Sequence, residues 1–170
     1  MTTLLSFEEF EGLLSEPGKM ELLDGELIRL PPANIRRTKI IHRLSDLLRL
    51  IAGKTGAGLG VVDIEAGYKI GPNNWLQPDV SITRRGQPET DYLEGAPALA
   101  IEVISESDTA DQIERKVKLY LANGAQEVWV VYPKTRTVWV FQEGRAEEFR
   151  GILRSAVGGG IEIDLEAIFP

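Results

Sequence analysis

Residues 98–105 read Ala-Leu-Ala-Ile-Glu-Val-Ile-Ser, and this stretch decides the fold. Both alternating sets of side chains are apolar apart from one carboxylate, which predicts a strand buried on both faces of a sheet. The carboxylate belongs to Glu102. A lone ionised glutamate in such a strand is costly unless it is paired, hydrogen-bonded or bound to a metal. The partner of Glu102 is therefore the main question about function.

The composition sets bounds on the rest of the protein. The chain has 170 residues, enough for one domain over residues 1–170 with a sizeable core. Cysteine is absent, which excludes disulfides and thiolate chemistry and is consistent with a reducing, cytoplasmic setting. We recognise no signal peptide and no apolar run of membrane-spanning length, so we expect no membrane partner. The net charge of −7 argues against broad coating of nucleic acid but permits a local basic patch.

Apolar periodicity predicts helices and strands on both sides of the central strand. The helices are a short one capped by Ser6 and two long ones, at residues 35–52 and from about 109 to 122. The strands are a hairpin at 20–30, one continuous strand at 61–70, a short strand at 77–82, and a hairpin at 127–132 and 137–142. The Val-Trp-Val runs of the last hairpin could provide the edge of a homodimer. We predict an α/β protein with a mixed sheet flanked by helices.

Three charged residues are candidates for one catalytic site. Asp79 lies where a turn enters a strand, and Glu102 lies inside the buried strand. At about 100° per residue, Lys116 falls beside Val117 and Tyr120 on the helix face directed at the sheet. Carboxylates can hold Mg²⁺ through their oxygens, and a lysine can orient or deprotonate water or neutralise charge on a phosphate. The set therefore predicts cleavage of phosphodiesters.

Each candidate also has a plain structural interpretation. Asp79 alone is typical of a turn or a cap. Glu102 and Lys116 could form a structural ion pair, or Lys116 could pack only its stem against the sheet. Glu65 shares a strand face with other charges and fits a solvated surface, and Glu26 fits an ordinary strand residue after a turn.

The first long helix carries basic residues that could contact phosphates: Arg36, Arg37, Lys39 and Arg43. A solvated helix face is an equally good interpretation. His42 lies roughly opposite the apolar stripe of this helix, so we expect it to face solvent. Because it is the only histidine, a histidine-based metal cluster or triad is not expected. Trp75 could stack on a base, but packing in the core is the default expectation.

An ordered set of segments covers nearly the whole chain. The segments are Glu21-Leu22-Leu23-Asp24-Gly25-Glu26-Leu27, Gln77-Pro78-Asp79-Val80, Gly95-Ala96-Pro97, Ile101-Glu102-Val103-Ile104-Ser105, Lys116 with Tyr120, and residues 124–133. No single segment is specific. Together, in this order and spacing, they resemble the Uma2 family (DUF820) of restriction-endonuclease-like proteins.

The resemblance implies the fold of the PD-(D/E)XK nuclease superfamily, a mixed sheet flanked by helices. It implies that Asp79 is the aspartate of the first half-motif and Glu102 the acidic residue of the second. It also implies a divalent metal, Mg²⁺ or Mn²⁺, and DNA as the substrate class. Glu65 stands where relatives often carry an acid, which makes it a further metal candidate, and Glu26 is a weaker one.

The sequence departs from the family pattern at two positions. The superfamily lysine normally follows the second acid by two residues, and here that position is Ile104. The resemblance suggests that Lys116 has taken the role. Arg37 stands where many relatives carry a histidine. Three functions therefore remain open. The protein could be a metal-dependent nuclease acting on DNA, or an inactive nuclease-fold module that binds nucleic acid or a protein partner. It could also be a hydrolase of another phosphate ester.

Overall fold

The computed structural model of the protein describes residues 2–55 and 58–170. The helices are α1 (Phe7–Glu11), α2 (Ile35–Thr55) and α3 (Ala110–Ala122), with short 3₁₀ turns at Val157–Gly159 and Leu165–Ala167. The strands are β1 (Lys19–Leu23), β2 (Glu26–Leu30), β3 (Leu59–Ile64), β4 (Tyr68–Lys69), β5 (Trp75–Leu76), β6 (Val80–Arg84), β7 (Leu93–Glu94), β8 (Leu99–Val103), β9 (Glu127–Tyr132), β10 (Thr137–Gln142), β11 (Arg145–Phe149), β12 (Ile152–Ser155) and β13 (Ile161–Asp164). The predicted α/β class is confirmed.

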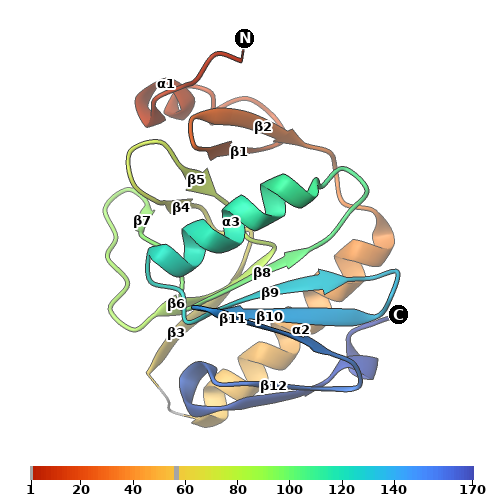
Figure 1. The fold of residues 1–170 in the computed structure, drawn as a ribbon. Coiled ribbons are helices and arrows are strands. Elements are labelled where there is room, and N and C mark those ends of the chain that lie inside the picture. The colour runs from red at the N-terminus through yellow and green to blue at the C-terminus, as the bar shows by residue number, and fades with distance from the viewer. Residues whose placement is uncertain (1, 56–57) are drawn as a thin grey trace.

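The central sheet has the strand order β11-β10-β9-β8-β6-β3. Strands β8 and β9 are parallel, and the other neighbours are antiparallel, so the sheet is mixed. β8 lies in the interior of the sheet and is buried along its whole length, as its apolar sequence predicts. Helix α2 covers one face and α3 covers the other (Figure 1).

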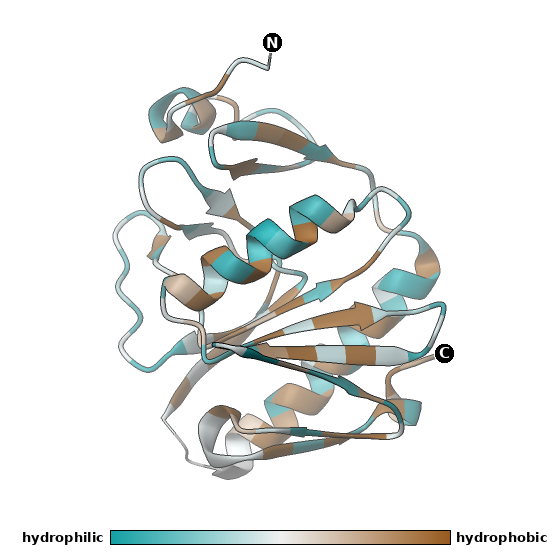
Figure 2. Ribbon diagram, in the orientation of Figure 1, coloured by the Kyte–Doolittle hydropathy of each residue, from teal (hydrophilic) through white to brown (hydrophobic). Residues whose placement is uncertain are grey.

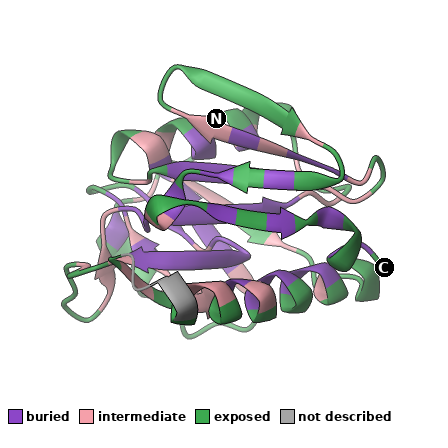
Figure 3. Cartoon of the chain, turned by 90° about the horizontal axis from the view of Figure 1, so that it is seen from below, coloured by how far each residue is buried: buried purple, intermediate pink, exposed green. Residues whose placement is uncertain are grey.

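Helix α2 packs against the sheet through one apolar stripe. Ile40, Leu44 and Leu48 recur at helical spacing and are buried, as predicted, in a core shared with Val80 and Ile101. Figure 3 shows the result, because the side of α2 that faces the strands is buried and the opposite side is exposed. The apolar residues colour the central strands brown in Figure 2. The β12–β13 hairpin joins the same core at the C-terminal end.

A second sheet, with the order β2-β1-β5-β4-β7, lies on the α3 side of the molecule. Leu23, Tyr68 and Leu76 of this sheet share a core with Val117 and Tyr120 of α3. The buried residues of α3, which are Ile113, Lys116, Val117 and Tyr120, lie on one face of the helix, and this face packs against both sheets. This arrangement brings β1, which is distant in sequence, next to Lys116.

The predicted continuous strand at 61–70 is wrong. The strand ends at Ile64, and Glu65 adopts a left-handed backbone with φ of 54°. Gly67 then passes so close to the ring of Trp75 that a Cβ there would lie 2.0 Å from it. The break carries the chain from the central sheet into β4 of the second sheet, which simple alternation of apolar residues cannot reveal.

The Val-Trp-Val hairpin, which could have provided the edge of a homodimer, is not at the edge of the sheet, because β11 pairs with β10. Ser6 caps α1, as predicted, and forms a capping box with Glu9, and the β1–β2 hairpin is also as predicted. Trp75 packs with aromatic residues of α1 in the core. Among the described residues, no helix has both the length and the apolar character that a membrane crossing requires.

Candidate active site

The two predicted acids meet across neighbouring strands. β6 and β8 are antiparallel with Val80 opposite Ile101, so the next pair in this register is Asp79 and Glu102. Val80 and Ile101 pack on the α2 side, and side chains alternate along a strand. Both acids therefore lie at the same end of the strands on the α3 face. Asp79 is completely buried, and Glu102 is nearly so.

Helix α3 supplies the partners of Glu102. Oε1 of Glu102 accepts hydrogen bonds from Nζ of Lys116 at 3.2 Å and from the hydroxyl of Tyr120 at 3.0 Å. The Lys116 ammonium also forms an ion pair with Oε2 of Glu21 on β1, at 2.6 Å. Oε1 of Glu21 accepts the backbone N–H of Gln77 at 2.9 Å. One buried lysine thus joins α3 to both sheets.

A second set of contacts holds Asp79. Its Oδ2 accepts the backbone N–H of Val103 at 2.7 Å, and its Oδ1 accepts Nη2 of Arg37 at 2.6 Å. Arg37 also donates from Nε to the carbonyl of Val103 at 3.0 Å, so its guanidinium bridges the ends of two strands. Lys19 donates to the same Oδ1 at 3.3 Å and lies 3.4 Å from Oε1 of Glu65.

The charges of the cluster perturb one another. Burial raises the pKa of Glu102 to about 7, Lys116 opposes the rise, and the carboxylates of Glu21 and Asp79 add to it. Burial alone would lower the pKa of Lys116, but attraction to Glu102 and Glu21 outweighs burial and raises that pKa. The pKa of Lys19 is raised in the same way, chiefly by Asp79 against the effect of burial. Both lysines are therefore cations at neutral pH.

The structure brings the main predicted residues into this cluster. Lys116 pairs with Glu102, and Asp79 lies opposite Glu102 in the register of the two strands. Glu65 reaches Asp79 through Lys19, although the side chain of Glu65 is 45% exposed. Of the basic residues on α2, Arg37 binds Asp79, Arg36 donates to the carbonyl of Pro133 at 2.8 Å, and Lys39 and Arg43 are exposed.

Glu26 and His42 lie outside the cluster. Glu26 pairs with Arg115 at 3.3 Å on the outer side of α3. His42 is exposed, as expected.

Sequence reasoning missed Glu21, Lys19 and the role of Arg37. The available signal for Glu21 was its position in the apolar strand β1, where all of the last four residues are buried. An acid in such an apolar run needs a buried partner for its charge, as Glu102 does in β8. For Lys19 and Arg37 no local signal exists, because their partner Asp79 is 60 and 42 residues away in sequence.

The donors suit a hard divalent cation, because carboxylate oxygens are its preferred ligands. Within residues 2–55 and 58–170, no three acidic or histidine side chains converge as a metal site. Asp79 and Glu65 do converge, but on the ammonium of Lys19. Glu102 faces Lys116 instead. The carboxylates of Asp79 and Glu65 therefore have the chemistry that a divalent cation requires, but the ammonium of Lys19 occupies the position between them.

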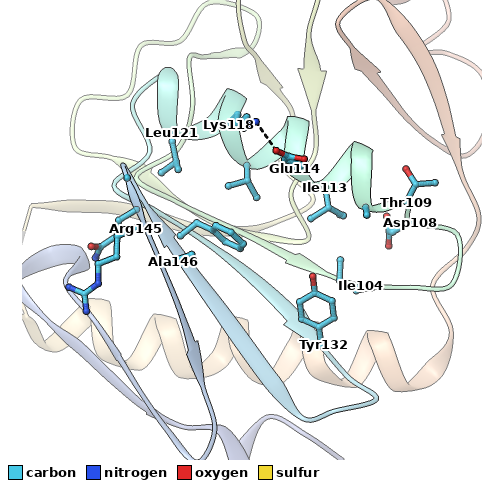
Figure 4. A pocket seen from close by; sticks show the side chains of 15 residues that line it. Ile104, Asp108, Thr109, Ile113, Glu114, Lys118, Leu121, Tyr132, Arg145 and Ala146 are labelled. Atoms are coloured by element: carbon cyan, nitrogen blue, oxygen red, sulfur yellow. Dashed lines mark hydrogen bonds and ion pairs between the residues drawn. The ribbon is translucent and has the colours of Figure 1, made fainter.

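Two cavities help to locate the site relative to solvent. One, of about 750 Å³, lies between α3 and strands β9–β11 and is lined mainly by apolar side chains such as Ile113, Leu121 and Tyr132 (Figure 4). None of the carboxylates of the cluster lines it. A smaller cavity of about 440 Å³ is lined by Lys19, Arg37, His42 and Glu65 among others. This cavity borders the cluster and connects it to solvent.

The fold and the buried cluster of acids and cations define an α/β protein with a charged site at one end of its central strands. The chain matches the family Uma2, described as "Putative restriction endonuclease", over residues 7–170, and it belongs to that family. A crystal structure described as a putative nuclease belonging to DUF820, from Anabaena variabilis ATCC 29413, has a TM-score of 0.80 at 17% identity and covers 97% of both chains. That likeness establishes the fold. No curated protein matches the chain.

Proposed function

We propose that this protein is a metal-dependent nuclease that hydrolyses phosphodiester bonds in DNA. The observation that carries the proposal is the pairing of Asp79 and Glu102 across adjacent strands, with the Lys116 ammonium 3.2 Å from Glu102. A protein has little structural reason to gather three buried acids, Glu21, Asp79 and Glu102, with three cations at one place, and such clusters of perturbed groups are typical of functional sites. The membership in the Uma2 family supports nuclease chemistry and DNA as the substrate.

The state of Lys116 limits its role. Because its pKa is raised by Glu102 and Glu21, it stays protonated and cannot take a proton from water. We assign it the stabilisation of negative charge on the phosphate and the orientation of the attacking water. Burial raises the pKa of Glu102 to about 7, and a cation bound beside this carboxylate would favour the ionised form that serves as a ligand. Tyr120 fixes the orientation of that carboxylate through its hydrogen bond.

Asp79, Glu65 and Glu102 are the residues that would hold Mg²⁺ or Mn²⁺. When bound, such a cation supplies positive charge beside the phosphate and makes water a better nucleophile. On the surface of α2, Arg36, Lys39 and Arg43 follow the spacing i, i+3 and i+7, so they share one helix face and are exposed. We assign this face to the DNA backbone, because exposed arginines and lysines are the usual contacts to phosphates.

Cleavage of supercoiled plasmid DNA with and without millimolar Mg²⁺ tests the proposal. Asp79→Asn and Glu102→Gln should each abolish metal-dependent cleavage and keep the circular dichroism spectrum of the folded protein. Glu114→Gln is the matched control, because this glutamate is exposed on α3 and pairs with Lys118 on the helix surface. Cleavage by the Asp79 and Glu102 variants at the wild-type rate would refute the assignment.

A second function is favoured by one observation. Asp79 and Glu102 each already bind a cationic side chain, and Ile104 occupies the position of the usual superfamily lysine. In a nuclease-fold module that binds nucleic acid or a protein without cleaving it, the acids would have no catalytic role, and such ion pairs would serve only to hold the fold together. Gel-shift experiments with labelled DNA separate the two functions, since the module would bind DNA equally well in chelator and leave it intact in Mg²⁺.

A further inference from the structure

Lys19 stands between the two acids that are expected to share a metal. Its ammonium lies 3.3 Å from Oδ1 of Asp79 and 3.4 Å from Oε1 of Glu65. Glu65 directly follows β3 and Asp79 directly precedes β6 of the central sheet, whereas β1, which carries Lys19, belongs to the second sheet. The ammonium therefore enters the acid pair from outside and neutralises it.

Lys19 is the most easily displaced of the three cations in the cluster. Arg37 is held at 2.6 Å by Asp79 and also binds the carbonyl of Val103, and Lys116 lies between two buried acids. The contacts of Lys19 are longer, and its charge sits on a flexible stem.

There is also space for Lys19 to leave. The cavity of about 440 Å³ that it lines adjoins the cluster, and the side chain is already 14% exposed. If it swings into this cavity, Asp79 keeps its hydrogen bonds from Arg37 and from the backbone of Val103. The acid pair would then be free for another cation without loss of its support.

We propose that Lys19 is an internal competitor for the divalent cation, which must displace its ammonium from Asp79 and Glu65 into the adjoining cavity. This inference rests on the proposed metal-dependent function and adds a residue that sets the metal affinity. An ammonium and a divalent cation cannot both occupy a gap between two carboxylates at these distances, because their charges repel. Lys19 therefore weakens metal binding and keeps the acids neutralised when metal is scarce.

Calorimetric titration of the full chain with Mn²⁺ tests the proposal directly. Lys19→Met should bind Mn²⁺ at least about tenfold more tightly than the wild type, since a repulsive charge has been removed. Lys19→Arg keeps the charge and should bind no more tightly than the wild type. Lys69→Met is the matched control, because this lysine lies 4.5 Å over the ring of Phe7 and outside the acid pair. In the Lys19→Met background, Glu65→Gln should reverse the gain.

Amine labelling of the wild type gives a second readout that needs no variant. Saturating Mn²⁺ should accelerate acylation of Lys19 by a succinimidyl ester, measured by mass spectrometry, and leave the exposed Lys39 unchanged as the internal reference. Equal Mn²⁺ affinity of Lys19→Met and wild type, or labelling of Lys19 that metal does not change, would overturn the role of Lys19 and leave the nuclease proposal standing. Binding of Mn²⁺ by neither protein would overturn both.

Discussion

Replacing Lys116 with methionine should destabilise the fold far more than the same change at Lys118, two residues along α3. The side chain of Lys116 is 6% exposed and contacts two buried acids, Glu21 and Glu102. Lys118 is 73% exposed and pairs with Glu114 on the helix surface. Removing one partner of a buried ion pair costs about 3–5 kcal/mol, whereas an exposed i,i+4 pair contributes about 0.3–0.5 kcal/mol. The two substitutions remove the same atoms from the same helix, so the contrast isolates burial.

The penalty at Lys116 should also depend on pH. Without the lysine, Glu21 and Glu102 face each other without a cation, and protonation of Glu102 relieves the repulsion. The pKa of Glu102 is already about 7 with the lysine present, so the protonated form is accessible below neutral pH. Urea unfolding at about pH 8 and about pH 5.5 should therefore give a larger penalty at the higher pH. A penalty for Lys116→Met within about 0.5 kcal/mol of that for Lys118→Met at about pH 8 would refute the reasoning.

The remaining predictions concern Glu102 and two glycines. Because burial raises the pKa of Glu102 from 4.5 to about 7, the folded protein holds its proton more tightly, and the contribution of this group to stability falls as pH rises through that interval. The unfolding free energy of Glu102→Gln relative to wild type should thus rise between those pH values by up to on the order of 3 kcal/mol, and a difference independent of pH would contradict the shift. Gly67→Ala should lose about 1–3 kcal/mol or more, seen as a lower melting temperature, because its Cβ would overlap the ring of Trp75. Gly53→Ala, in α2 with open space around it, should instead gain about 0.5–1 kcal/mol, and equal effects at both glycines would show that the close approach at Gly67 is not real.

The centre of the molecule could be predicted from sequence because its signals are local. An apolar run with one acid identified the strand that contains Glu102, and helical phasing placed Lys116 on the face toward the sheet. Lys116 and Glu102 are only 14 residues apart, on a strand and on the helix that follows it in the chain. So short a connection allows few ways of packing the helix on the sheet, and the contact could therefore be predicted.

The outer part of the cluster could not be predicted, because it depends on where the second sheet lies. Glu21 and Lys19 reach the site only because the chain breaks at Glu65 and crosses into that sheet. The break depends on the close approach of Gly67 to Trp75, a contact between neighbouring segments that apolar alternation does not encode. The sequence therefore predicted the acids and the lysine of the centre, but not the cations that neutralise Asp79.

Anomalous diffraction from a crystal soaked in Mn²⁺ tests most directly whether the cluster is a metal-dependent site. The account predicts one strong peak in contact with the carboxylates of Asp79, Glu65 and Glu102, with the Lys19 ammonium moved away from Asp79 and Glu65. A structure at millimolar Mn²⁺ in which these side chains keep the ion pairs described above, with manganese bound only elsewhere on the surface, would contradict it.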